Sequence, residues 1–225
     1  MNPTAEIVSD TSGFADELLD IAKVVLGLDG QHQFLMHGYT RVDDLWSVEL
    51  ADALAAEARI VHPRATWPEA RPGPETVDSI NRSPARQVTI EVTPLLAALH
   101  ESLTRVARVL SARMVVPSVG TYGYYEHDDG CYLHLDTESA DVTFLINVLG
   151  ELGPLHVHPE LVGLAMDDLH ALEADPAWDR QSGQPLQYPR RGVAAIRGRQ
   201  LPHHRPGAPV SGLHVVGAIH YRALF

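Results

Sequence analysis

The segment CYLHLD holds two residues suited to metal chemistry, His134 and Asp136. In a β-strand, residues i and i+2 point to the same face, so this imidazole and this carboxylate would face one ion together. A second imidazole from a distant strand would complete a set of two histidines and one carboxylate. Such a set leaves the other side of an octahedral iron(II) open for substrate and dioxygen. The pattern therefore predicts a non-haem iron site.

The composition is typical of a folded globular protein with many metal-ligand candidates. Of 225 residues, 45% are apolar and 20% are charged. The 17 Lys and Arg against 29 Asp and Glu give a formal net charge of −12, which repels phosphate backbones and anionic lipid surfaces. The single Cys131 excludes an intramolecular disulfide and a multi-cysteine zinc site. The 13 histidines are the side chains whose neutral form binds first-row metals.

Length and hydropathy suit one domain over residues 1–225, with a helical part at about 1–113 and a β-core at about 114–225. No apolar run approaches the roughly 20 residues of a membrane-spanning helix. The start MNPTAEIVSD lacks the basic and apolar stretches of a secretion signal. We expect a cytoplasmic protein with a small-molecule partner, no nucleic acid and no membrane, and we leave a homodimer open.

The N-terminal part shows helical spacing of apolar residues. The predicted helices are Ser12 to Gly27, about Asp43 to Ala58, and a third that begins at Thr93-Pro94 and continues to about Leu110. Threonine caps a helix and proline suits its first turn, so the third helix has the clearest start. A short strand is expected at 33–38. The proline-rich stretch 62–84 predicts a surface loop or lid.

After residue 113 the chain changes to short runs rich in Val, Ile, Tyr and Thr, a pattern typical of β-strands. Asp129-Gly130 predicts a tight turn, and 164–179 a short inserted helix. We expect an α+β fold in which the N-terminal helices buttress one antiparallel β-structure. The expected strands are residues 114–126, 131–136, 142–149, 155–158, 193–197 and 213–221.

Several weak motifs follow one another in a fixed order over about residues 114–221. In that order the chain resembles the iron(II)/2-oxoglutarate-dependent dioxygenases. The resemblance implies a double-stranded β-helix, a jelly-roll or cupin-like core. The matching motifs are His134 and Asp136, Val142-Thr143, the GPL of 153–155, the segment 192–198, His204-Arg205, and Gly212.

The resemblance also names a third metal ligand. The family carries a histidine followed by arginine, which matches His204 and Arg205. His204 is therefore the predicted distal ligand, with its neighbour His203 as the competing candidate.

The cosubstrate site departs from the family pattern. The family has an arginine ten residues after the distal histidine to bind the far carboxylate of 2-oxoglutarate, and position 214 is His214. His214 itself, Arg222, Arg205 or Arg197 would have to take that task. An oxidase that does not use 2-oxoglutarate is the alternative.

Other polar residues on the predicted strands are candidate cosubstrate contacts. Alternation places Tyr125 on one strand face and Tyr122 and Tyr124 on the other. Tyr125 is the predicted contact. Asn147 and Thr143 share a face of their strand, and Asn147 is the second predicted contact.

The resemblance implies an oxidoreductase that uses iron(II), 2-oxoglutarate and O2. Through a ferryl species it would hydroxylate or otherwise oxidise a small metabolite, such as an amino acid or a natural-product intermediate. A cupin-like isomerase or metal sensor is a second hypothesis, because His156, His158 and Glu160 form a loose H-x-H-x-E set. A catalytically inactive member that serves as a binding module is the third.

Overall fold

The computed structural model describes residues 27–67, 86–126, 130–206 and 212–225. The predicted helix from Ser12 therefore lies outside the described residues, as do 68–84 of the predicted lid and Asp129 of the predicted turn. The described helices are α3 Gly27–His37, α4 Val48–Val61, α5 Pro94–Ser102, α6 Thr104–Ser111 and α7 Met166–Ala174, with short 3-10 turns at His62–Arg64, Ile90–Val92 and Pro159–Leu161. None of them is long and apolar enough to span a bilayer.

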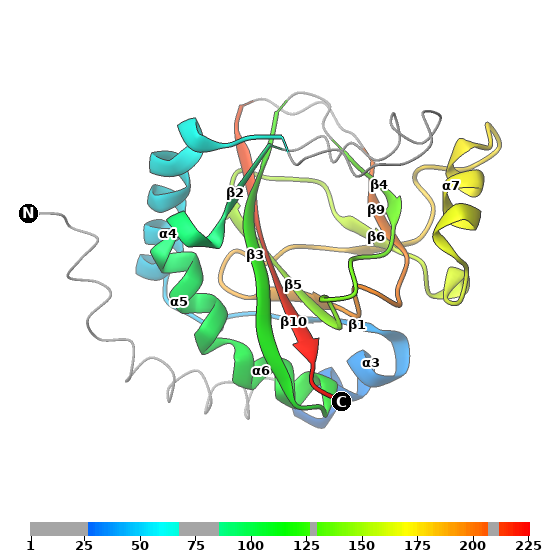
Figure 1. Ribbon diagram of the computed structural model, residues 1–225, viewed down its shortest axis with the longest axis horizontal. Helices are drawn as coiled ribbons and strands as arrows, with labels where there is room; N and C mark the ends of the chain where they lie inside the picture. The colour runs from blue at the N-terminus through cyan, green and yellow to red at the C-terminus, as the bar shows by residue number, and fades with distance from the viewer. Residues whose placement is uncertain (1–26, 68–85, 127–129, 207–211) are drawn as a thin grey trace, which may run out of the picture.

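Two antiparallel sheets form the centre of the molecule (Figure 1). The six-stranded sheet has the order β1-β8-β5-β10-β3-β2, and the four-stranded sheet has the order β4-β9-β6-β7. An apolar cluster drawn from β6, β7 and β8 lies between them. The strands are β1 Tyr39–Val42, β2 Arg86–Thr89, β3 Val115–Tyr125, β4 Cys131–His134, β5 Val142–Leu149, β6 Leu155–Val157, β7 Gln184–Leu186, β8 Val193–Ile196, β9 His203–Arg205 and β10 His214–Ala223.

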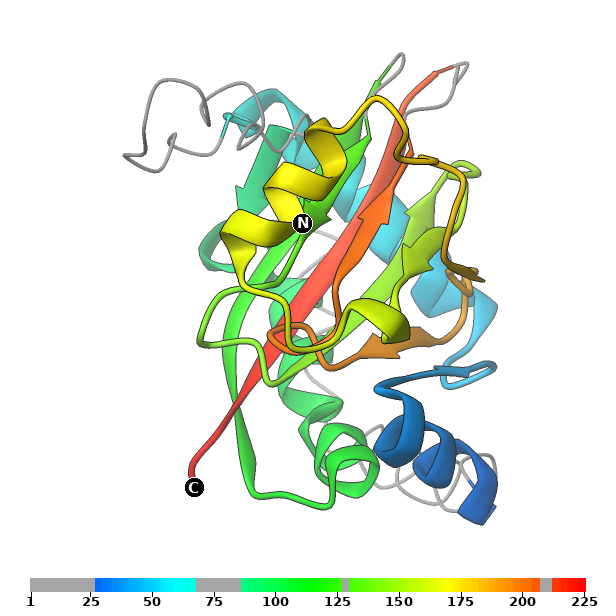
Figure 2. The ribbon, with the colours of Figure 1, turned by 90° about the vertical axis from the view of Figure 1, so that its right-hand side faces the viewer.

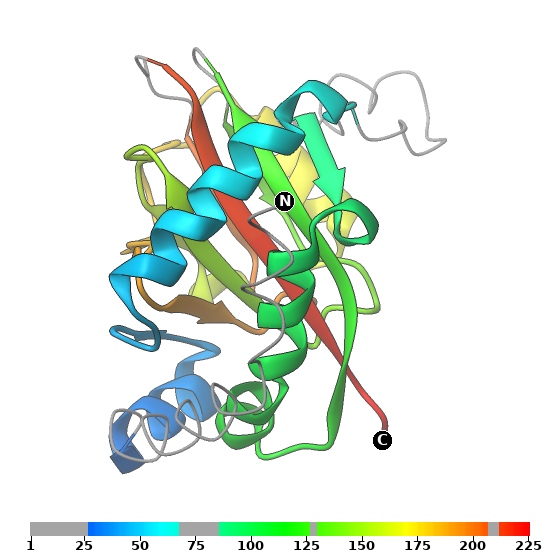
Figure 3. The same ribbon diagram turned by 90° about the vertical axis from the view of Figure 1, so that its left-hand side faces the viewer.

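Helices cover both outer sides of this pair of sheets. Helices α4, α5 and α6 lie across the outer face of the six-stranded sheet (Figure 3), and their apolar sides form the large core with it. Helix α7 lies on the outer side of the four-stranded sheet (Figure 2). Both sheets that enclose this space are thus packed against helices on their outer sides.

A buried carboxylate joins two of the helices to the sheet. Glu57 of α4 is 4% exposed and accepts hydrogen bonds from the backbone N–H groups of Leu95 and Leu96 at 2.7 and 3.1 Å. It also accepts one from the Tyr122 hydroxyl at 2.8 Å. Glu57 thereby satisfies the free N–H groups at the start of α5. The predicted cap, Thr93, makes no side-chain capping bond.

The structure confirms most predicted elements and corrects some. Residues 33–37 belong to helix α3, Gly38 follows the helix, and the strand comes after it at Tyr39–Val42. The next helix begins after the cap Ser47, whose hydroxyl accepts from the N–H of Leu50. The long third helix breaks at Leu103 into α5 and α6. Strands β1, β2, β7 and β9 were not predicted, because each is short and its partners are far away in sequence.

Candidate metal centre

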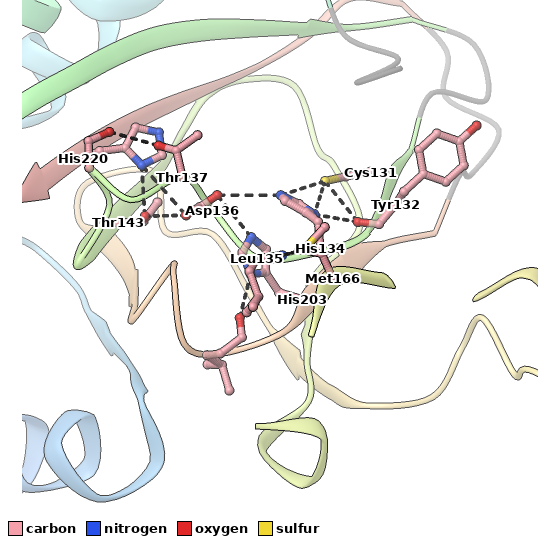
Figure 4. A network of polar contacts seen from close by, with 12 residues as sticks. Cys131, Tyr132, His134, Leu135, Asp136, Thr137, Thr143, Met166, His203 and His220 are labelled. Atoms are coloured by element: carbon pink, nitrogen blue, oxygen red, sulfur yellow. Dashed lines mark hydrogen bonds and ion pairs between the residues drawn. The ribbon is translucent and has the colours of Figure 1, made fainter. Parts of the chain in front are cut away.

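Three side chains converge between the sheets. Donor atoms of His134, Asp136 and His203 all lie within 4.8 Å of one another. Nε2 of each histidine is 3.6 Å from Asp136 Oδ1 (Figure 4). In the part of the chain that the structure describes, these residues form the one such group of three His, Cys, Asp or Glu side chains.

The pairing of two short strands brings the histidines together. His134 of β4 and His203 of β9 are direct antiparallel partners, and their ring centroids are 4.3 Å apart. Asp136 follows β4, and its backbone N–H donates to the Gly198 carbonyl at 2.9 Å. A Cβ at position 198 would collide with Asp136 Oδ2 and Thr143 Oγ1. Glycine at 198 is therefore required for the carboxylate to sit where it does.

Backbone carbonyls fix the tautomer of both histidines. Nδ1 of His134 bonds to the Tyr132 carbonyl at 2.6 Å, and Nδ1 of His203 bonds to the Leu201 carbonyl at 2.9 Å. A carbonyl only accepts, so both Nδ1 atoms carry the proton, and in the neutral ring Nε2 keeps a free lone pair. This arrangement is the usual one for a histidine that binds a metal through Nε2.

The carboxylate is held in its ionised form. Burial alone would raise the pKa of Asp136, but the charge of His203 and the close approach of the His134 and His203 rings outweigh burial and keep that pKa well below its usual range. When a metal cation takes the place of the protons on Nε2, the two imidazoles and the carboxylate are donors that iron(II) accepts. The residues therefore fit a divalent first-row metal.

The structure places His203, and not the predicted distal ligand His204, beside His134 and Asp136. Successive residues of a strand point to opposite faces, and it is His203 that faces His134. His204 lies on the outer face of β9, where its Nδ1 is 3.0 Å from His158 Nε2 and its Nε2 donates to the Arg180 carbonyl at 2.9 Å. The His-Arg motif of the family matches His204-Arg205 in sequence, but the histidine beside His134 and Asp136 is one residue earlier, His203.

Behind the metal site, β9 carries a buried cation with unused donors. Arg205 is two residues from His203, so it shares the inward face of the strand. It is 3% exposed, and its guanidinium lies over the Tyr125 ring at 3.7 Å from the centroid. Its Nε and Nη2 have no hydrogen-bond partner. These two N–H groups form one edge of the guanidinium, the fork that matches a carboxylate.

Two predicted cosubstrate residues lie in the same region. His214 is the direct cross-strand partner of Tyr125, and both of its ring nitrogens are buried without a partner. Asn147, one pleat along on β5, also has a buried oxygen without a partner. Buried polar groups are nearly always hydrogen-bonded in native proteins. These unpaired atoms therefore indicate a place for a polar, anionic ligand.

Arg222 and Arg197 do not take part in this group. Arg222 pairs with Val116 at the far end of β10 from His214, and it is exposed. Arg197 donates to the Leu35 carbonyl at 2.9 Å. Arg222, predicted to contact the same ligand as His214 and Tyr125, therefore lies apart from these two residues in the structure. Arg205, weighed only as one alternative, is the arginine beside them.

An open cavity of about 680 Å³ reaches Asp136 from the other side. Its wall includes Leu135, Met166, Arg199 and Arg222. The metal group thus lies beside a space that is open to solvent.

The remaining candidates have structural partners. The Tyr122 and Tyr124 hydroxyls donate to Glu57 and to the Ala58 carbonyl on the helical side, as the alternation predicted. The H-x-H-x-E set is not a metal group of its own. His158 bonds to Glu160 at 2.7 Å, and His156 Nδ1 donates to the Ser182 carbonyl at 2.7 Å.

No protein-family model matches the sequence, and no curated protein is significantly similar to it. The structure does match solved ones. HygX from Streptomyces hygroscopicus, solved with nickel and 2-oxoglutarate bound, aligns with a TM-score of 0.66 over 88% of this chain and 87% of its own, at 13% identity.

Two further structures give similar agreement. The non-haem α-ketoglutarate-dependent epimerase SnoN from nogalamycin biosynthesis aligns with a TM-score of 0.63 over 86% of this chain and 81% of its own, at 12% identity. A prolyl hydroxylase from Trichoplax adhaerens, solved with a hypoxia inducible factor peptide fragment, gives 0.62 over 92% and 91%, at 10% identity. At these identities the likeness shows a shared fold.

Proposed function

We propose that this protein is an iron(II)- and 2-oxoglutarate-dependent oxygenase with a double-stranded β-helix core. The observation that carries the proposal is the inward face of β9. His203 directs Nε2 to the position that Asp136 and His134 also face, and Arg205 offers an unpaired carboxylate-binding edge one pleat further along. A metal ligand and a carboxylate receptor on one strand face suit a cosubstrate that binds a metal at one end and carries a free carboxylate at the other.

In this proposal His134, Asp136 and His203 hold iron(II), which supplies dioxygen activation when it is bound. The carbonyls of Tyr132 and Leu201 keep the Nε2 lone pairs directed at the metal position. The three ligands occupy one side and leave the other for ligands that are not protein atoms. The protein's contribution at this position is orientation and exclusion of competing donors.

Arg205 takes the task that the family gives to an arginine ten residues after the distal histidine. Its guanidinium cannot lose its proton in a protein, so it needs an anionic partner in this buried place. The Tyr125 ring below it supports its plane through a cation–π contact. His214 and Asn147 supply further unpaired polar atoms nearby.

We further propose that the substrate is a small molecule that enters through the open cavity beside Asp136. The cavity reaches a metal ligand and has both apolar walls, Leu135 and Met166, and cationic ones, Arg199 and Arg222. The SnoN relative of known structure acts in nogalamycin biosynthesis. A natural-product intermediate or an amino acid fits this setting.

The test is an anaerobic titration of the purified protein with iron(II) and then 2-oxoglutarate. We expect one iron(II) per chain, a weak visible charge-transfer band when 2-oxoglutarate is added, and loss of the band in Arg205→Gln. Iron binding without the band would replace the proposal by an oxidase that does not use 2-oxoglutarate. No iron binding would reject an oxygenase altogether.

A further inference from the structure

The second oxygen of the Asp136 carboxylate is held by a hydroxyl group. Asp136 Oδ1 faces both histidines, while Oδ2 is 2.6 Å from Thr143 Oγ1. An ionised carboxylate only accepts hydrogen bonds, so the Thr143 hydroxyl is the donor. Thr143 is 1% exposed, which means that water does not compete for this bond.

A histidine outside the predicted site holds the hydroxyl in turn. His220 Nδ1 is 3.0 Å from Thr143 Oγ1. The single proton of the hydroxyl is already donated to Asp136, so His220 Nδ1–H must be the donor to the Thr143 oxygen. His220 Nδ1 is 3.8 Å from Asp136 Oδ2, beyond hydrogen-bond range. His220 therefore acts on the carboxylate through Thr143 (Figure 4).

The strands fix this chain of donors firmly. His220 of β10 and Thr143 of β5 are direct antiparallel partners, so their side chains share one face. The His220 carbonyl accepts from Ser118 Oγ at 2.9 Å and from His100 Nε2 at 2.8 Å. These two hydrogen bonds hold the backbone at His220 in place and thereby fix the position from which its imidazole extends.

We propose that Thr143 and His220 are positioning residues that reserve Asp136 Oδ1 for the metal by keeping Oδ2 occupied. A carboxylate without this restraint can rotate or bind a metal through both oxygens, which would take up a position needed for another ligand. Partners of metal ligands commonly change metal affinity by 10–100-fold when they are removed. The inference rests on the proposed metal site and adds two residues to it.

The experiment compares metal binding in four variants, with cobalt(II) as the probe because its visible spectrum reports coordination. In Thr143→Val the hydroxyl is replaced by a methyl group of similar size, and we expect about 10–100-fold weaker cobalt(II) binding by calorimetry and a changed visible spectrum. Thr143→Ser keeps the hydroxyl and should restore both. His220→Phe should change the spectrum in the same direction, with a smaller loss of affinity.

Thr40→Val is the matched control. Thr40 is a buried threonine of β1 in the same sheet, 1% exposed, and its hydroxyl lies 3.3 Å from Gln33 rather than from the site. It should bind cobalt(II) like the wild type. If Thr143→Val binds cobalt(II) with wild-type affinity and spectrum, the positioning role is overturned while the metal site stands. A wild-type protein that binds no cobalt(II) and no iron(II) would instead overturn the proposed function.

Discussion

The two faces of strand β9 carry adjacent histidines with opposite roles. On the inner face, Nδ1 of His203 donates a hydrogen bond to the Leu201 carbonyl, and Nε2 lies 3.6 Å from Asp136 Oδ1. On the outer face, both ring nitrogens of His204 have hydrogen-bond partners in the protein. The difference shows that residue type alone does not make a metal ligand. A histidine is available to a metal only where the fold satisfies one nitrogen and leaves the other.

The same contrast extends to the neighbours of each histidine. Arg205 follows on the inner face with two unpaired N–H groups. On the outer face, His158 contacts His204 through Nε2 and Glu160 through Nδ1. The inner face is therefore arranged for ligands, and the outer face for stability.

The largest expected difference between the faces is in metal binding. His203→Ala should abolish binding of one iron(II) per chain, measured by anaerobic equilibrium dialysis, because two ligands remain. His204→Ala should keep the stoichiometry and lower the free energy of unfolding by about 2 kcal/mol, because it removes the partner of the buried His158 ring and of the Arg180 carbonyl. The opposite pattern would restore His204 as the ligand.

We expect Arg205 to increase the affinity for 2-oxoglutarate and to decrease the stability of the ligand-free protein. Arg205→Met removes a buried, unpaired charge, so we expect the ligand-free protein to melt at a higher temperature. The same variant should lose 2-oxoglutarate affinity by about tenfold to a hundredfold, the value of a charge-assisted hydrogen bond, while it keeps iron(II). Calorimetry with 2-oxoglutarate and a thermal melt measure both effects. An unchanged affinity would remove Arg205 from the cosubstrate site.

Gly198 should matter through the space it leaves. In Gly198→Ala the new methyl group meets Asp136 Oδ2 and Thr143 Oγ1, so the carboxylate must move. We expect weaker iron(II) binding and a stability loss of about 1–3 kcal/mol, typical of overpacking. Gly153→Ala, where a Cβ meets nothing within 4 Å, is the control and should change neither quantity.

The smallest expected effect is an acid sensitivity that originates on the outer face. Burial lowers the pKa of His204 from 6.5 to about 4, so the fold disfavours its extra proton. Its contribution to stability is complete above about pH 6.5 and is lost as the pH falls toward 4. We expect the melting temperature to drop by several degrees between pH 7 and pH 5.

In His204→Phe that drop should be smaller, whereas exchange of the exposed His32 for Phe should leave it unchanged. Burial also lowers the pKa of His100 to about 4, which accounts for the part that remains in His204→Phe. An identical pH profile in His204→Phe and wild type would mean that the outer face does not sense acid.

Local sequence rules predicted much of the fold. The strands β3, β4, β5, β6, β8 and β10 and the helix start at Thr93 were predicted because their patterns depend on near neighbours, whereas β7, β9 and the break at Leu103 were not. The edge strands β1 and β2 were also missed, because each forms only by pairing with a strand that is distant in sequence, β8 and β3 respectively. Residues 33–38 were misassigned because a short apolar run has no clear period.

Part of the candidate site follows from simple rules of strand geometry. His134 and Asp136 share a face by simple alternation, and the structure brings them together. The choice between His203 and His204 depended on the register of β9, which only three residues define. Residues two apart in a strand share a face, so the spacing of His203 and Arg205 indicates that the two side chains point to the same side. His220 left no signal in the sequence, because its role arises from its partner across the strand.

The central claim is that His203, together with His134 and Asp136, binds the metal. A crystal of the protein grown with nickel(II) and measured at the nickel absorption edge tests it directly. The account predicts one strong anomalous peak within about 2.1 Å of Nε2 of both His134 and His203. A peak between His158 and His204, with none at Asp136, would contradict it.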